Sequence, residues 1–195
     1  MYREYSSLHW FNLQSVERAL VAKTGSQARV TLDSPAVSVM TDFSQVPAAV
    51  VEPDANIATA NDFMKRRRVR ALLVTDPDVI GILTATDVLG EKPVTLALER
   101  GVRRDEIRVA DIMTPRELIE LIPFSEIREA RVGHIVATLK QAGRQHLLVG
   151  ERASSGVVVV RGIFSLSQVA RQLGVDLQPN SFAHTFAEIE AALGH

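Results

Sequence analysis

Apolar residues in the first half of the chain follow a helical period that is flanked by continuous apolar runs. Ile57, Ala60 and Met64 recur every three or four positions, and Asn56 stands where an N-cap belongs. The flanking runs are too short for helices and indicate strands buried within a sheet. The pattern predicts, in order, a strand over 48–51, a helix through 57–64, strands over 71–74 and 79–83, and a short helix over 84–89.

The second half of the chain repeats this order of elements. Val132, Ile135 and Leu139 share one helical face, and Gly143 suits the end of that helix. The elements expected here are a strand over 118–122, a helix through 132–139, strands over 146–149 and 157–164, and a helix over 165–173. Each half therefore predicts a β-α-β-β-α unit, and the whole chain predicts a mixed α+β or α/β fold.

The amino acids themselves also repeat, which supports an internal duplication. The triplet Val39-Met40-Thr41 corresponds to Ile112-Met113-Thr114 at an offset of 73, and 71–74 corresponds to 146–149 at an offset of 75. The run that begins at Gly81 corresponds to the run that begins at Gly162, at an offset of 81. Insertions between matched elements produce such a growing offset, and the polar stretch 151–156 is expected to be the larger insertion, a hairpin turn.

The duplication divides the chain into repeat units and segments outside them. We expect an N-terminal extension over 1–35 that holds one amphipathic helix, and a first unit over 36–90. A connecting segment over 91–108 is expected to contain a helix over 93–100, because Pro93 suits a first helical position and Gly101 a helix end. The second unit is expected over 109–175. A C-terminal helix, capped by Ser181, is expected within 176–195.

Composition narrows the class of protein. The 195 residues are 46% hydrophobic and carry a net charge of −1, so a partner such as nucleic acid, which favours a basic excess, is disfavoured. The chain has no cysteine, which excludes a disulfide framework and a thiolate metal site. Neither a bilayer-spanning run nor an apolar leader is found, so we expect a cytoplasmic protein that does not contact membranes.

The matched motifs resemble those of the CBS-domain family, whose units occur in tandem pairs called Bateman modules. The resemblance rests on Val39-Met40-Thr41, Asp111-Ile112-Met113-Thr114-Pro115, the strand 71–76 and the run 81–87, and it covers roughly 36–175. It departs from the family at Leu73 and Leu148, where a proline is usual. The resemblance implies two CBS units packed as a pseudo-twofold pair. It also implies a cleft that binds an adenosine-containing ligand (AMP, ADP, ATP or S-adenosylmethionine), a homodimer, and no catalytic residues.

The strongest candidate ligand group is Thr84 with Asp87, the position of the family's ribose motif. A carboxylate can accept hydrogen bonds from two vicinal ribose hydroxyls. The same two residues could instead form only a helix cap. In the second unit, Ser165 keeps the hydroxyl, but Gln168 replaces the carboxylate. A neutral amide should hold ribose more weakly, so the sequence predicts that the Asp87 site binds first.

The remaining candidates surround these motifs. Lys65-Arg66-Arg67-Arg68 and Arg70 form the densest basic run, which could neutralise phosphate, with Arg70 the best placed, or could be a solvated helix end. The resemblance places backbone contacts to adenine at the same point, and His146 holds the matching place in the second unit. The complete candidate set is Thr41, Val69, Arg70, Ala71, Gly81, Thr84, Thr86, Asp87, His146 and Ser165.

Function follows from the resemblance and from what the sequence lacks. The five histidines show no metal-binding spacing, and the chain has neither a nucleophile elbow nor a phosphate-binding glycine loop, so neither catalysis nor a metal or other cofactor is expected. The favoured hypothesis is a regulatory module that senses a nucleotide and signals to an unidentified downstream protein. The alternative is a ligand-free dimerisation or scaffold module, which Gln168 and the missing strand prolines favour.

Overall fold

The computed structural model describes residues 30–175 and 187–189. The helix expected within 1–35 and the cap at Ser181 lie outside these residues. Residues 187–189 are helical, and the Ile189 side chain is buried against the second repeat unit.

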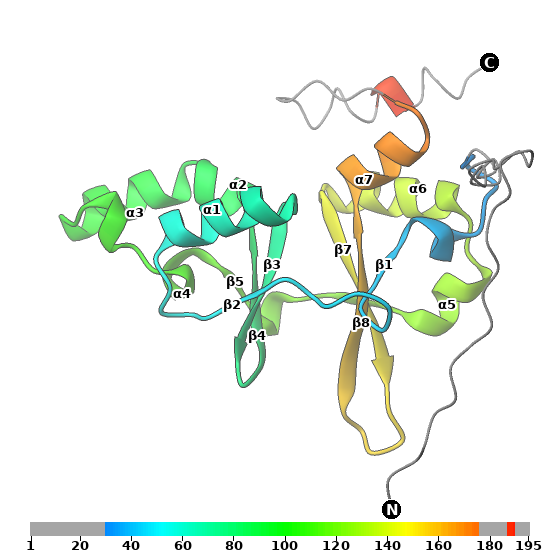
Figure 1. Cartoon of the computed structure of the whole chain (residues 1–195), viewed down its shortest axis with the longest axis horizontal. Coiled ribbons are helices and arrows are strands. Elements are labelled where there is room, and N and C mark those ends of the chain that lie inside the picture. The colour runs from blue at the N-terminus through cyan, green and yellow to red at the C-terminus, as the bar shows by residue number, and fades with distance from the viewer. Residues whose placement is uncertain (1–29, 176–186, 190–195) are drawn as a thin grey trace, which may run out of the picture.

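Two small sheets lie side by side, and each contains one long β-hairpin (Figure 1). The first hairpin pairs β3 (Ala71–Asp76) with β4 (Asp78–Thr84), and the second pairs β7 (His146–Arg152) with β8 (Val158–Ser165). A short parallel strand flanks each hairpin: β2 (Val50–Val51) pairs with β3, and β6 (Leu121–Pro123) pairs with β7. The hairpins match the sequence prediction closely. The strand expected over 118–122 begins later, because Arg116–Leu118 forms a 3-10 turn.

The fourth strand of each sheet comes from the beginning of the other repeat. Strand β1 (Thr41–Asp42) precedes the first hairpin in the chain, yet it pairs with β8 of the second. Strand β5 (Thr114–Pro115) precedes the second hairpin, yet it pairs with β4 of the first. The strand orders β1-β8-β7-β6 and β5-β4-β3-β2 are therefore equivalent, and the copies exchange their first strands (Figure 1).

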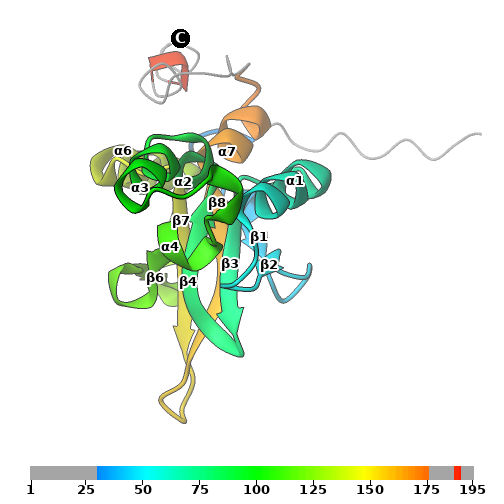
Figure 2. The same ribbon diagram turned by 90° about the vertical axis from the view of Figure 1, so that its left-hand side faces the viewer.

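Most of the helices lie at one end of the molecule, and the hairpin turns point away from them (Figure 2). In the first unit, α1 (Ile57–Arg67) begins at Asn56, whose side chain accepts a hydrogen bond from the Ala58 amide as the sequence predicts, and α2 (Ala85–Leu89) follows β4. In the second unit, α6 (Val132–Ala142) ends at Gly143, and α7 (Leu166–Gln172) follows β8. An additional helix, α5 (Phe124–Glu129), precedes α6 and was not evident from the apolar pattern.

The connection between the units follows the prediction. Helix α3 (Lys92–Arg100) has Pro93 in its first turn and ends at Gly101, whose φ of 64° lies in the left-handed region that favours glycine. The short helix α4 (Val109–Ile112) then leads into β5. None of the helices in the described residues is long and apolar enough to cross a membrane.

Two separate apolar cores reflect the exchange of strands. Side chains of α1, β3, β4 and α2 form the first core, together with Val109 and Ile112 from the segment that leads into β5. The second core contains α6, α7 and the β7–β8 hairpin, together with Ala36 and Val39 from Ala36–Val39, the 3-10 turn that precedes β1. The predicted mixed α+β fold with two helix-covered sheets is confirmed. Its cores are each built from parts of both repeats.

Candidate functional site

Two pockets lie between the repeat units, and their walls are equivalent under the duplication. The larger, about 550 Å³, is lined by Thr41, Ser165, Ser167 and Gln168, and we call it the Gln168 pocket. The smaller, about 460 Å³, is lined by Thr114, Thr84, Thr86 and Asp87, which occupy the matching positions, and we call it the Asp87 pocket. Each pocket needs residues from both repeats, because its wall includes the exchanged strand.

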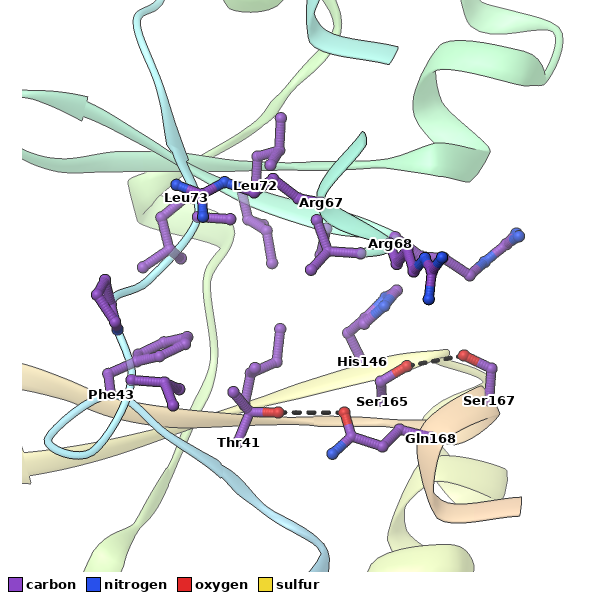
Figure 3. Close-up of a pocket in the computed structure, with 18 of the residues that line it drawn as sticks. Thr41, Phe43, Arg67, Arg68, Leu72, Leu73, His146, Ser165, Ser167 and Gln168 are labelled. Atoms are coloured by element: carbon purple, nitrogen blue, oxygen red, sulfur yellow. Dashed lines mark hydrogen bonds between the residues drawn. The ribbon is translucent and has the colours of Figure 1, made fainter. Parts of the chain in front are cut away.

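The floor of the Gln168 pocket is a network of neutral polar groups (Figure 3). The Thr41 hydroxyl donates to Oε1 of Gln168 at 3.1 Å, and the Ser165 and Ser167 hydroxyls lie 3.0 Å apart. Phe43 and Leu73 lie toward one end of the pocket, whereas Arg68 and Ser167 lie toward the other (Figure 3). The pocket therefore has an apolar end and an end that carries positive charge.

The cationic wall comes from the turn between α1 and β3. Arg68 ends α1 with a φ of 55°, and it is the one non-glycine residue with positive φ in the part of the chain described. The matching position in the second repeat is Gly143, with a φ of 60°. A side chain in the left-handed region costs about 1 kcal/mol relative to glycine, so the first repeat keeps an arginine at the pocket against a local preference for glycine.

Positive charge in the Gln168 pocket has no negative counterpart. Arg67, Arg68, Arg70 and Arg171 line it, and no aspartate or glutamate does so among the described residues. None of these arginines forms an ion pair with another described residue. The Arg67 guanidinium lies over the Phe63 ring, 5.4 Å from its centroid. The charges of Arg68, Arg70 and Arg171 are therefore more available to a ligand than that of Arg67.

The Asp87 pocket has the opposite balance of charge. Asp87 Oδ2 accepts from the Thr84 amide at 2.9 Å and from the Thr84 hydroxyl at 2.6 Å, and Lys92 Nζ donates to Oδ1 at 2.5 Å. The Asp87 amide donates in turn to the Thr84 hydroxyl at 3.2 Å, which completes a capping box. Glu120 also lines the pocket and pairs with Arg144 at 2.9 Å. Both carboxylates therefore already have partners.

His146 is shared by the two pockets. It begins β7, is partly buried, and lines both cavities. Burial, together with the positive charge of Arg70, lowers the pKa of His146 to about 4, although Asp87 acts in the opposite direction. His146 is therefore neutral at pH 7 and separates a cationic pocket from an acidic one.

The structure divides the residues selected from the sequence between the two pockets. Thr41, Val69, Arg70, Ala71 and Ser165 line the Gln168 pocket, and His146 lines both. Thr84, Thr86 and Asp87 line the other pocket, so Asp87 does not share a cavity with Arg70. Gly81 lines neither pocket. A side chain on it would come within 3.0 Å of the Thr114 carbonyl, so it permits β5 to pair closely.

Sequence reasoning missed part of the Gln168 pocket. Arg171 and Phe43 line the pocket but belong to no repeated motif, so the repeats do not point to them. The sequence does contain a signal for Arg68. The offset of 75 aligns Arg68 with Gly143, so an arginine stands where the second repeat has the glycine that ends a helix. Within the described ranges, no group of three or more histidines, aspartates or glutamates could hold a metal ion.

Comparison with known proteins agrees with this architecture. The model of the CBS domain matches residues 36–93. No curated protein matches the chain. An uncharacterised conserved protein from Pyrococcus horikoshii is 21% identical, with a TM-score of 0.51 over 77% of this chain and 100% of its own. CBSX2, a CBS-pair protein of Arabidopsis thaliana, was solved in complex with AMP; it is 19% identical, with a TM-score of 0.50 over 71% of this chain and 94% of its own.

At these identities the two structures report on the fold, and the domain model reports on residues 36–93 alone. Both agree with the duplicated motifs and with the paired sheets described above. Residues 36–93 therefore contain a match to the CBS domain, and the two repeats together have the fold of the CBS-pair structure to which the chain is similar.

Proposed function

We propose that the protein is a non-catalytic regulatory module that binds an adenosine-containing ligand in the Gln168 pocket. The observation that supports this most is the pocket itself: a cavity of about 550 Å³ between the repeats, with an apolar end and arginines that form no ion pair with the other described residues. Small-molecule sites commonly have such a volume and combine apolar walls with a few polar groups. The CBS-pair structure of similar fold that contains AMP supports the same ligand class.

The shape of the pocket suits a nucleotide laid along it. The apolar end, with Phe43 and Leu73, offers surfaces on which a base can pack. The opposite end offers guanidinium groups that pair well with phosphate oxygens. Binding would connect both repeats, because Thr41 and Arg68 come from one and Ser165 from the other. Ligand binding would thereby alter how the units pack, and a partner protein could sense this change.

Isothermal titration of the full chain with AMP, ADP, ATP and S-adenosylmethionine tests this proposal. We expect at least one of them to bind, and silence for all four at millimolar concentrations would refute it. Thr41→Val and Thr114→Val form a matched pair, because they remove equivalent hydroxyls from the two pockets. Thr41→Val should weaken binding severalfold, whereas Thr114→Val should leave it unchanged. The reverse result would assign the ligand to the Asp87 pocket.

A ligand-free dimerisation or scaffold module is the second candidate, and the state of Asp87 favours it. The carboxylate accepts two hydrogen bonds from its own helix cap and one from a lysine, so most of its roughly four acceptor sites are already used and cannot all serve a ribose. A thermal-shift screen separates the candidates, because a ligand that binds only the folded state raises the melting temperature by mass action. No shift with any nucleotide would favour the scaffold.

Homodimerisation is proposed under both candidates. Helices α2 and α3 expose Leu89, Val94 and Leu98, whose exposed fractions are 61%, 53% and 79%. Apolar side chains grouped in this way are commonly covered by a partner. Sedimentation at micromolar concentration should give a dimer, and Leu98→Glu should weaken it. A wild-type species near the 21.4 kDa of one chain would contradict the proposal.

A further inference from the structure

We infer that the Gln168 pocket selects its ligand by phosphate charge, taking a polyphosphate in preference to a monophosphate, and that ribose hydroxyls contribute little. This rests on the proposed function and specifies its ligand class. It also reverses the order of binding expected from the Asp87/Gln168 difference, because the pocket without the carboxylate becomes the main site.

The first support is the charge of the two pockets. Among the described residues, four arginines and no carboxylate line the Gln168 pocket, whereas the Asp87 pocket has one arginine, Arg144, against Asp87 and Glu120. A monophosphate would leave most of the four charges without a partner. A di- or triphosphate carries enough negative charge to engage several guanidinium groups at once, and such charge-assisted hydrogen bonds are the strong ones.

The second support is the position of these arginines. Arg68 and Arg70 flank the turn into β3, and Arg171 lies one helical turn beyond Gln168 on α7, so they approach from both repeats. The strained backbone of Arg68 matters here, because the matching turn of the other repeat has Gly143 and no strain from a side chain. Strain that persists beside a cavity is characteristic of functional sites.

The third support is the lack of a ribose acceptor. The oxygen of Gln168 already accepts the Thr41 hydroxyl, and no carboxylate lies among the described lining residues. Ser165 and Ser167 can bind a hydroxyl only through neutral hydrogen bonds, and their hydroxyls already lie within hydrogen-bond distance of each other. A neutral hydrogen bond that replaces one to water adds little net affinity.

Titration of the full chain with AMP, ADP, ATP and 2′,3′-dideoxy-ATP, without divalent cations, tests the inference. We expect affinity to rise about tenfold or more from AMP to ATP, as one added charge-assisted contact allows, and to change less than about threefold when the ribose hydroxyls are removed. Inorganic tripolyphosphate should displace ATP. Equal affinity for AMP and ATP, strong dependence on the hydroxyls, or no displacement by tripolyphosphate would overturn the inference while the proposed function stands. Silence for every nucleotide would overturn both.

Arg68→Gly tests the wall without damaging the fold. The substitution installs the residue found in the second repeat, so the protein should melt at the same temperature or higher, yet its preference for ATP over AMP should fall severalfold. Arg171→Gln should lower the same preference. Arg66→Gln is the matched control, because Arg66 is an exposed arginine of α1 that lines neither pocket. An unchanged ATP preference in Arg68→Gly and Arg171→Gln would contradict the assignment to this wall.

Discussion

Neutral His146 between the two pockets should make the protein sensitive to mild acid. Its pKa is about 4 in the folded protein against 6.5 in an unfolded chain, so unfolding is accompanied by proton uptake mainly between pH 4 and pH 6.5. A depressed pKa means that the stability from this group is complete above pH 6.5 and is lost as the pH falls toward 4. Linkage gives a loss of about 2 kcal/mol at pH 5 and about 3 kcal/mol below pH 4.

Urea unfolding of the wild type and of His146→Gln at pH 7.5 and pH 5 measures this effect. The glutamine cannot take up the proton, so the wild type should lose about 2 kcal/mol more stability than the variant between the two pH values. His134→Gln is the control for replacing an exposed histidine of the same repeat: it leaves His146 in place, so the loss of about 2 kcal/mol that His146 causes should persist in this variant. Equal losses in the wild type and His146→Gln would refute the reasoning.

Three further predictions concern the contacts that hold the pockets in place. Arg161→Met removes the largest of the contacts that lower the pKa of Asp42 to about 2, the others being hydrogen bonds from Ser44, so it should reduce stability at pH 7, and calorimetric scans should show the difference shrinking as the pH falls from 3.8 toward 2. Gly162→Ala should cost about 1–3 kcal/mol in urea unfolding, because the new Cβ would lie 2.6 Å from the Thr41 carbonyl oxygen. Asp87→Asn should cost about 1 kcal/mol in melting experiments by losing the Lys92 ion pair, and titration should show ATP affinity within about twofold of the wild type, since Asp87 lies outside the Gln168 pocket.

Elements with a strong local signal were predictable from the sequence. The Asn56 cap, the Gly143 end of α6 and the proline-led helix α3 all appear where local rules place them, because each depends on backbone groups within a few residues. Helix α5 did not have such a signal. It is six residues long and follows β6 directly, so its apolar positions could not be distinguished from those of the preceding strand.

The composition of each pocket could not be predicted from the repeats. Motif matching assigns Thr41 and Asp87 to one unit, but Thr41 pairs with Ile163 of β8 and its hydroxyl contacts Gln168. Whether β1 completes the sheet of its own repeat or that of the other repeat depends on long-range strand pairing. The local sequence of β1 is the same in both arrangements, so it cannot distinguish them. The Thr84–Asp87 cap was predicted as an alternative to ribose binding, and its hydrogen bonds are those of a capping box.

The exchange of β1 and β5 also determines what would happen if the chain were divided between its repeats. A fragment ending after α3 would retain β1 with no β8 to receive it and would lack the β5 that pairs with β4. The complementary fragment would have the reverse defect, so each piece would expose the edge that the other covers. The two halves should therefore behave as a split protein that regains its structure only on mixing. An unduplicated ancestor could complete its sheet in this way only by domain swapping with a second chain, and the duplication places both arms within one polypeptide.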